Sequence, residues 1–214
     1  GNCPQYAKGK GFAELYSRLK ENGPFDLIGF QECDNPGQII AGTSLSSSFG
    51  YFTPPKGNDA PMAWNSQKFK VLEGPNVQWV ARDKYGDRNV NWVRLQVIGS
   101  TETIFFANTH GPLDQCGGQP GSTVAKNYIS VVTKHKKPKD AVVFTGDFNC
   151  GSNQDTIKDL SQVLKLDAPR WIIGCHKLLI RQPCDVPHLE LLYPQMSDDV
   201  WVWCQLGTNG WTSA

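Results

Sequence analysis

Three short clusters of polar residues in this 214-residue chain each follow a run of apolar residues. The clusters are Gln31-Glu32, Asn108-Thr109-His110 and Asp147-Phe148-Asn149. Apolar strands fix the residues at their ends, and side chains fixed in this way suit catalysis or metal binding. A single cluster of this kind can equally be a turn or a cap, because Asp and Asn favour turns. Three clusters that together carry carboxylates, an imidazole and an Asp-x-Asn pair favour a site.

The candidate residues are rich in oxygen donors and poor in soft ligands. Glu32 and Asp147 are hard anionic donors that suit Mg²⁺ or Ca²⁺, and no grouping of sulfurs or histidines competes for zinc. In an extended segment Asp147 and Asn149 point the same way, so that they could orient a water and hold a phosphate oxygen. His110 could donate to a second phosphate oxygen. This set fits metal-assisted cleavage of a phosphodiester, in which a cation neutralises the developing charge.

The pattern of apolar residues predicts the elements that position these side chains. Helical spacing predicts helices over 12–20, 123–133 and 157–164, the last with Asn153 as its N-cap. Apolar or alternating runs predict strands over 25–30, 91–97, 103–108, 141–145 and 200–205. Residues 35–62 are rich in Gly, Ser and Pro and are predicted as loop, with one helical turn over 38–41. These elements indicate a single mixed α/β domain with long loops.

Composition excludes several classes of protein. A net charge of +1 argues against a protein that binds nucleic acid through bulk electrostatics, since such domains are usually strongly basic. No run of about 18 apolar residues is present, so the sequence predicts no transmembrane segment. None of the seven cysteines lies in a Cys-x-x-Cys pair, which disfavours a zinc cage or a thioredoxin-like site.

The three clusters carry a family resemblance. The segments 25–32, 108–110 and 145–149 resemble, in order and spacing, the motifs of the endonuclease/exonuclease/phosphatase superfamily, which includes deoxyribonuclease I. The Gly-Asp-Phe-Asn run after an apolar strand is the most specific of these matches. The resemblance implies an α/β (α+β) fold, a deoxyribonuclease I-like four-layered sandwich of two packed mixed β-sheets flanked by helices. It also implies a single domain over residues 1–214.

The resemblance assigns roles to individual residues. Glu32 would be the metal ligand, with Mg²⁺, or else Ca²⁺ or Mn²⁺, as the cofactor. Asp147 and Asn149 would orient the attacking water and bind phosphate, and His110 would contact the scissile phosphate. Arg88 lies where the deoxyribonuclease I branch keeps a phosphate-contacting arginine, although an exposed loop arginine is the commoner explanation.

Departures from the family pattern put catalysis in doubt. The family's first strand ends in a metal-binding Asn, and we expect this chain to lack that strand. Glu190 stands in the place of a catalytic Asp, and its extra methylene shifts the carboxylate by about a bond length, where positioning must hold within ~0.5 Å. The family also ends in Ser-Asp-His, for which this chain has no match. Loss of a catalytic acid or base typically costs about 10²–10⁴-fold in rate.

These departures favour the first of two functions over the second, and a third hypothesis is that the full protein is longer and carries the complete catalytic set. In the first function, the chain descends from Mg²⁺-dependent phosphodiesterases, has impaired or no catalysis, and binds protein partners in a larger assembly. In the second, it is an active Mg²⁺-dependent nuclease or phosphodiesterase whose partner is a phosphate-ester substrate.

The cellular location depends on the cysteines. We expect Cys33 and Cys150 to pair or lie in contact, and disulfides would favour a secreted or lumenal protein over a cytoplasmic one.

Overall fold

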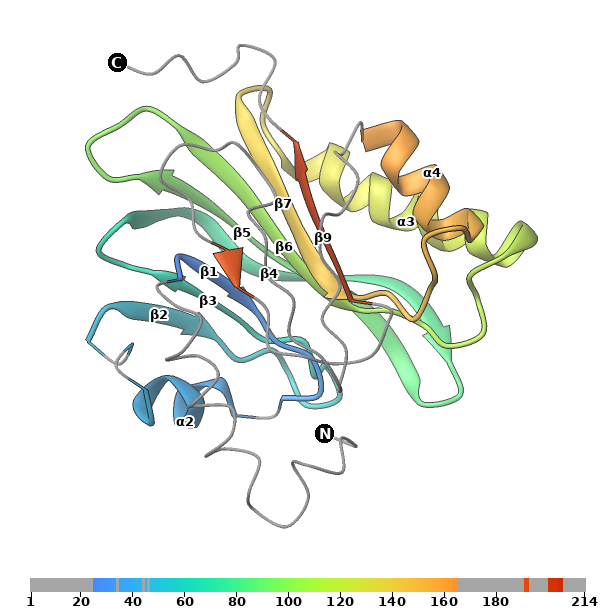
Figure 1. Cartoon of the computed structure of the whole chain (residues 1–214), viewed down its shortest axis with the longest axis horizontal. Helices are drawn as coiled ribbons and strands as arrows, with labels where there is room; N and C mark the ends of the chain where they lie inside the picture. The colour runs from blue at the N-terminus through green and yellow to red at the C-terminus, as the bar shows by residue number, and fades with distance from the viewer. Residues whose placement is uncertain are drawn as a thin grey trace.

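Two mixed β-sheets lie face to face in the computed structural model of this protein, with helices on their outer sides (Figure 1). The structure describes residues 25–33, 35–43, 45, 47–164, 191–192 and 200–205, the last two segments by their backbone only. Among these residues, no helix is long and apolar enough to cross a membrane.

The smaller sheet has four strands in the order β2-β3-β1-β8. Strand β1 (Leu27–Gly29) lies antiparallel to β3 (Met62–Asn65) and parallel to β8 (Leu191–Leu192), and β2 (Phe49–Phe52) pairs with β3. Helix α2 (Pro36–Ala41) is the next element after β1, and at its start the Asn35 side chain accepts a hydrogen bond from the Gln38 amide at 3.0 Å. This cap ends the chain segment that carries Gln31 and Glu32.

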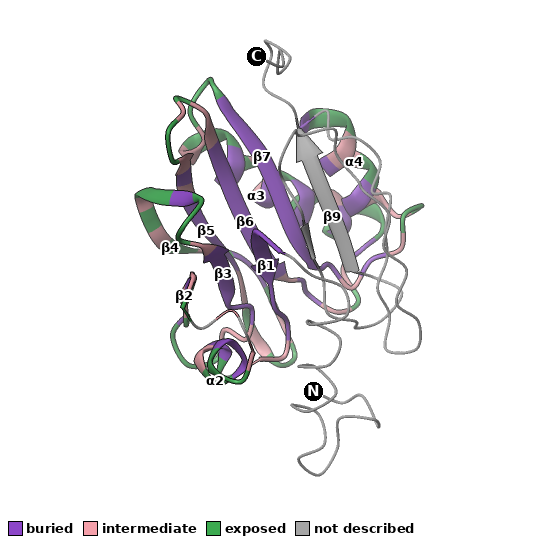
Figure 2. Cartoon of the chain, turned by 60° about the vertical axis from the view of Figure 1, so that its left-hand side comes forward, coloured by how far each residue is buried: buried purple, intermediate pink, exposed green. Residues whose placement is uncertain are grey.

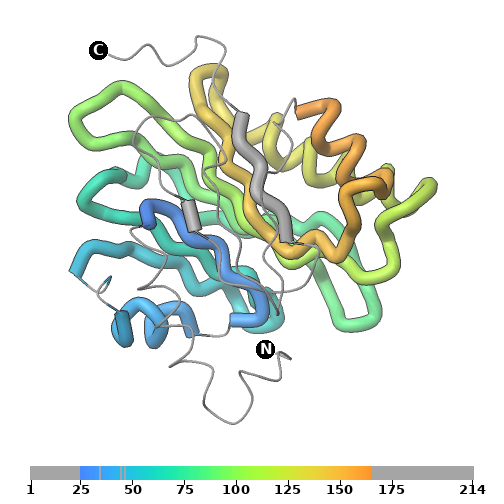
Figure 3. Tube along the Cα trace, in the orientation of Figure 1, coloured from blue at the N-terminus to red at the C-terminus, as the bar shows by residue number. Residues whose placement is uncertain are grey.

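The larger sheet has five strands in the order β4-β5-β6-β7-β9. Their bounds are β4 Phe69–Asp83, β5 Gly86–Val97, β6 Thr103–His110, β7 Asp140–Asp147 and β9 Val200–Gln205. Only β6 and β7 run parallel among these neighbours. Helix α3 (Gly118–His135) connects them, a path that Figure 3 traces, and α4 (Asp155–Leu164) follows β7. A parallel pair needs such a crossover, because the chain must return to the end at which the first strand began.

The core between the sheets is apolar and closely packed. Leu27, Met62 and Trp64 of the smaller sheet pack against Leu95, Phe106 and other buried residues of the larger one. On the outer side of the larger sheet, α3 and α4 cover a second core, and α2 covers a third on the smaller sheet. Strand β7 is therefore buried along its whole length, whereas β4 at the sheet edge is largely exposed (Figure 2).

The predicted strands and helices are confirmed wherever the structure describes them, although most are longer than predicted. The predicted helix over 12–20 lies outside the described residues. The predicted helical turn over 38–41 is confirmed as part of α2, but the assignment of the rest of 35–62 to loop was wrong in part, because it contains β2. The sequence also gave no sign of β4, whose apolar alternation is broken by register shifts and by Gly74-Pro75. Two packed mixed sheets with helices are confirmed.

Candidate functional site

The three polar clusters meet at one edge of the molecule. Strands β6 and β7 run parallel, and their register places His110 opposite Asp147 at the carboxyl ends of both strands. The smaller sheet joins this edge after β1, where the Gln31 side chain donates a hydrogen bond to Asn108 Oδ1 at 2.7 Å. Segments separated by 77 residues in the sequence are therefore in direct contact.

Asn108 holds this edge together from inside. Its side chain is fully buried, and its Nδ2 donates to the carbonyls of Phe30, Ala60 and Pro61 at 2.9–3.0 Å. Its Oδ1 accepts from Thr145 Oγ1 at 2.7 Å as well as from Gln31. Gly29 allows this close approach, because a Cβ there would lie 2.2 Å from Thr145 Oγ1. Asn108 is therefore a structural residue that binds both sheets together beneath the site.

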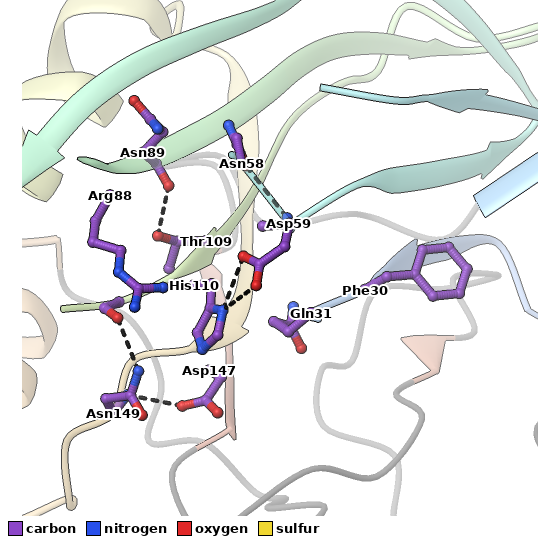
Figure 4. A network of polar contacts seen from close by, with 12 residues as sticks. Phe30, Gln31, Asn58, Asp59, Arg88, Asn89, Thr109, His110, Asp147 and Asn149 are labelled. Atoms are coloured by element: carbon purple, nitrogen blue, oxygen red, sulfur yellow. Dashed lines mark hydrogen bonds and ion pairs between the residues drawn. The ribbon is translucent and has the colours of Figure 1, made fainter. Parts of the chain in front are cut away.

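His110 forms an ion pair with Asp59, a residue that the sequence analysis did not select. Nδ1 of His110 lies 2.9 Å from Oδ1 and 3.0 Å from Oδ2 of Asp59 (Figure 4). Backbone hydrogen bonds fix the segment that carries Asp59, since the Cys33 amide donates to the Asp59 carbonyl at 3.3 Å and the Phe30 amide to the Pro61 carbonyl at 2.9 Å. The imidazole is thus oriented with Nδ1 on the carboxylate.

Asp59 and His110 shift each other's pKa in the direction that favours a charged pair. Burial alone lowers the pKa of His110, but the hydrogen bond and charge of Asp59 and the charge of Asp147 outweigh burial and raise the pKa above 6.5. Burial likewise raises the pKa of Asp59, but His110 and Arg88 outweigh it and hold the pKa below 3.8. The protonated, donating form of His110 is therefore favoured relative to that of an isolated histidine.

Asp147 and Asn149 form a tight turn at the end of β7. The Asn149 amide donates to Asp147 Oδ1 at 2.8 Å, and Asp147 is buried, with 5% of its surface exposed. Asn149 has a φ of 51°, a left-handed conformation that Asn tolerates better than most residues. The expectation that these two side chains extend from a flat strand was therefore wrong, because the strand ends at Asp147 and the chain turns.

Two further hydrogen bonds fix this turn against the end of β6. Nδ2 of Asn149 donates to the Gly111 carbonyl at 2.8 Å, and the Gly111 amide donates to the Asp147 carbonyl at 2.6 Å. Gly111 permits the contact, because a Cβ there would lie 2.4 Å from the Phe148 carbonyl oxygen. His110 and Asp147 are consequently held by adjoining, mutually bonded segments.

Arg88 lies in strand β5 and not in an exposed loop. Its side chain is 12% exposed, and its Nε donates to Asp83 Oδ2 at 2.9 Å. Its charge acts on both Asp59 and His110, and Figure 4 shows its guanidinium on the same side as His110 and Asn149. Within the described part of the chain, Arg88 makes no hydrogen bond through Nη1 or Nη2. Both nitrogens therefore remain available as hydrogen-bond donors.

Glu32 lies at the same edge, on the smaller sheet. Its neighbours place it there: Gln31 bonds to Asn108, and the Cys33 amide bonds to the backbone of Asp59. Glu32 lies three residues after the end of β1 and has a φ of 50°, in the left-handed region. No group of three His, Cys, Asp or Glu residues that could hold a metal ion exists among the described residues.

Other predicted features lie elsewhere or are corrected. Glu190 lies outside the described residues. The predicted pairing of Cys33 with Cys150 was wrong, because Cys150 forms a disulfide with Cys116, with a Cα separation of 5.3 Å. The loop after β6 carries Cys116 back to the turn at Asn149, and nothing in the linear spacing of the cysteines indicates this path.

The sequence offered little sign of Asp59. It lies in the run Pro54-Pro55-Lys56-Gly57-Asn58-Asp59, which has the composition of an ordinary surface turn. Its role arises from the pairing of β1 with β3, which brings the segment before β3 to the end of β6. Asp59 is the only carboxylate within residues 35–62, but its surroundings in the sequence gave no reason to assign it a role.

The fold is shared with solved structures of phosphate-ester enzymes. An endonuclease/exonuclease/phosphatase from Bacteroides vulgatus matches with 20% identity and a TM-score of 0.58, over 71% of this chain and 62% of that one. The mannosyl-6-phosphatase Bt3783 of Bacteroides thetaiotaomicron matches with 14% identity and a TM-score of 0.62, over 94% and 79%. TDP2 of D. rerio, solved with a single-strand DNA product, matches with 14% identity and a TM-score of 0.59, over 94% and 78%.

These likenesses concern the fold. No protein-family model matches the sequence, and no curated protein matches it. The chain spans less than two thirds of the Bacteroides vulgatus structure and of a second endonuclease/exonuclease/phosphatase structure from Bacteroides thetaiotaomicron. The chain therefore has the endonuclease/exonuclease/phosphatase fold, which confirms the resemblance found in the sequence.

Proposed function

We propose that this chain is a phosphodiesterase of the endonuclease/exonuclease/phosphatase type that acts with a divalent cation. The observation that carries the proposal is the Asp59–His110 ion pair, 2.9 Å long, at the strand ends that also hold Asp147 and Asn149. An imidazole paired with the Asp59 carboxylate and close to a guanidinium is suited to an anionic ester, because its protonated form can donate to a phosphate oxygen.

The proposed roles follow from the geometry. His110 donates from Nε2 to a phosphate oxygen. Asp59 accepts a hydrogen bond from Nδ1 and stabilises the positive charge of the imidazolium. Arg88 binds a second phosphate oxygen through Nη1 and Nη2 and stabilises the charge that develops on phosphorus. Asp147 accepts a proton from the attacking water, which Asn149 helps to orient. Glu190 would supply a further carboxylate.

The donors at this edge fit Mg²⁺ in chemical type. Mg²⁺ binds oxygen ligands and is commonly held by one or two carboxylates together with water and substrate phosphate, so a single ligand from Glu32 is compatible with it. A bound cation would neutralise charge on the phosphate. Ca²⁺ or Mn²⁺ is the alternative cofactor.

A second candidate function is phosphate-ester binding with impaired or no catalysis, as a subunit of a larger assembly. Two observations favour it: Glu190 stands where the resembled family has Asp, and the described residues bring together no three-ligand metal group. In this case Arg88 and His110 would still bind phosphate, while no hydrolysis would follow.

The substrate and the location belong to the same proposal. Mannosyl-6-phosphatase and TDP2 with its DNA product act on or bind different phosphate esters, so we propose the phosphate ester as the shared chemistry. The Cys116–Cys150 disulfide supports a secreted or lumenal protein.

We also propose that residues 1–214 form one domain with four layers, which is supported by α2 on one sheet and α3 and α4 on the other.

The experiment is hydrolysis of bis(p-nitrophenyl) phosphate and plasmid DNA by the full chain, with Mg²⁺ and with a chelator. We expect cation-dependent cleavage that falls by about 10²–10⁴-fold in Asp147→Asn and His110→Asn. Glu32→Ala should raise the Mg²⁺ concentration required. Asp87→Asn is the matched control, because it alters an exposed carboxylate of β5 that pairs with Arg82 of β4. Equal activity in wild type and Asp147→Asn would contradict the proposal, and phosphate binding without cleavage would establish the second candidate.

A further inference from the structure

The carboxylate of Asp83 lies behind Arg88 and makes three hydrogen bonds. Its Oδ2 accepts from Arg88 Nε at 2.9 Å and from the Leu113 amide at 3.0 Å, and its Oδ1 accepts from the Tyr85 amide at 2.8 Å. Only 3% of the Asp83 side chain is exposed. One buried anion thus joins the β4–β5 hairpin, the guanidinium at the site and the loop that follows His110.

The geometry restricts how Arg88 can meet a ligand. Because Asp83 occupies the Nε edge of the guanidinium, only the end of the group with Nη1 and Nη2 remains for an anion. A guanidinium is planar and rigid, so fixing one edge also fixes the direction of the other two nitrogens. Burial raises the pKa of Asp83, but the two backbone amides and Arg88 outweigh burial and hold it below 3.8, so the carboxylate stays ionised.

We propose that Asp83 is a positioning residue that aims the Nη1 and Nη2 donors of Arg88 at a phosphate oxygen. This inference rests on the proposed phosphate-ester site. It gives a role to a residue that the sequence presents as an ordinary turn residue, two positions before Tyr85 in the hairpin. Asp83 itself does not touch the substrate.

The same carboxylate also couples Arg88 to His110. The Leu113 amide that Asp83 binds lies three residues after His110, in the loop whose first residue, Gly111, bonds to Asp147 and Asn149. Loss of the Asp83 charge should therefore weaken two contacts, the one that fixes the guanidinium and the one that fixes this loop. A double-mutant cycle separates the two effects.

The test measures binding of inorganic phosphate to the full chain by calorimetry, for wild type, Asp83→Asn, Arg88→Ala and the double variant. Loss of a charge-assisted hydrogen bond at the site should weaken phosphate binding by about tenfold in Asp83→Asn. In the Arg88→Ala background the same substitution should weaken binding by less than about twofold, because its target is gone. Asp87→Asn should bind like wild type.

Each outcome is decisive. Additive losses in the double variant would show that Asp83 acts only through the fold, and wild-type affinity in Asp83→Asn, or no phosphate binding by wild type, would overturn the proposal. An NMR signal of Arg88 Nε–H that is protected from solvent exchange in wild type and lost in Asp83→Asn should accompany the coupled result. If phosphate binds with this coupling but no diester is cleaved, the proposed hydrolysis fails while the role of Asp83 stands.

Discussion

At the scale of single residues, the charge of His110 depends on the carboxylate beside it. Asp59 binds Nδ1 with both oxygens, and Asp147 lies opposite on the neighbouring strand. Arg88 acts in the other direction on His110, since its positive charge lowers the pKa of the imidazole. The balance leaves His110 protonated at a pH at which an isolated histidine has begun to lose its proton.

We predict that Asp59→Asn lowers the pKa of His110 below that of wild type. The substitution removes the hydrogen bond and charge that raise the pKa and leaves burial, which lowers it. An NMR titration of the His110 ring protons measures both values. A pKa that is unchanged by the substitution would show that Asp59 does not control the imidazole.

The same pair should make stability depend on pH at both ends of a window. The pKa of His110 is raised above 6.5, so its contribution is full below that pH and is lost as the pH rises through the raised value. The pKa of Asp59 is lowered below 3.8, so its contribution is full above that pH and is lost as the pH falls through the lowered value. The difference in unfolding free energy between wild type and Asp59→Asn should therefore be largest between these limits.

At the scale of the elements, the site is formed by connections between strand ends. Parallel β6 and β7 bring His110 and Asp147 together, and α3 makes this arrangement possible by returning the chain to the start of β7. The loop after β6 and the turn after β7 are then joined twice, by hydrogen bonds through Gly111 and by the Cys116–Cys150 disulfide. Rigid strands and a cross-linked pair of loops hold the donors in place.

We predict that removing this disulfide destabilises the protein. A cross-link between residues 34 apart restricts the unfolded chain, and the chain-entropy relation gives about 3–4 kcal/mol for a loop of this length. Urea unfolding of Cys116→Ser/Cys150→Ser should show this loss, with Cys33→Ser as the control outside the disulfide. Faster hydrogen exchange at the Asn149 and Gly111 amides should accompany it, and unchanged stability would contradict the prediction.

At the scale of the whole molecule, two sheets must pack before any site exists. The smaller sheet supplies Gln31, Glu32 and the segment with Asp59, and the larger one supplies Arg88, His110, Asp147 and Asn149. The apolar layer between them fixes their relative position, and Phe106 lies fully buried in that layer. Polar contacts at the edge, centred on Asn108, are consequences of this packing.

We predict that Phe106→Ala loses about 3–5 kcal/mol of unfolding free energy, the range for removing a large aromatic side chain from a core. Because the cavity would open between the sheets, the rate of phosphate-ester cleavage should fall with stability. Ile98→Ala is the control, since Ile98 is 55% exposed and should change stability by less than about 0.5 kcal/mol. A loss in Phe106→Ala no larger than in the control would contradict the packing.

The sequence by itself determined the strands that lead to Glu32, His110 and Asp147, because apolar runs followed by polar residues are local patterns. It also indicated the fold, through motifs that resemble those of the endonuclease/exonuclease/phosphatase superfamily, and solved structures of that kind share the fold. It did not determine β4, whose bulges break the alternation, nor the partner of Cys150.

Only the tertiary structure decided which other residues join the site. Asp59 and Asp83 both stand in segments with the composition of surface turns, and each acquires its role from a residue of another segment. Partners of this kind depend on sheet order and register, which arise from packing over the whole chain. Local sequence patterns identify the residues at the end of a strand, whereas only the fold determines which residues of other segments contact them.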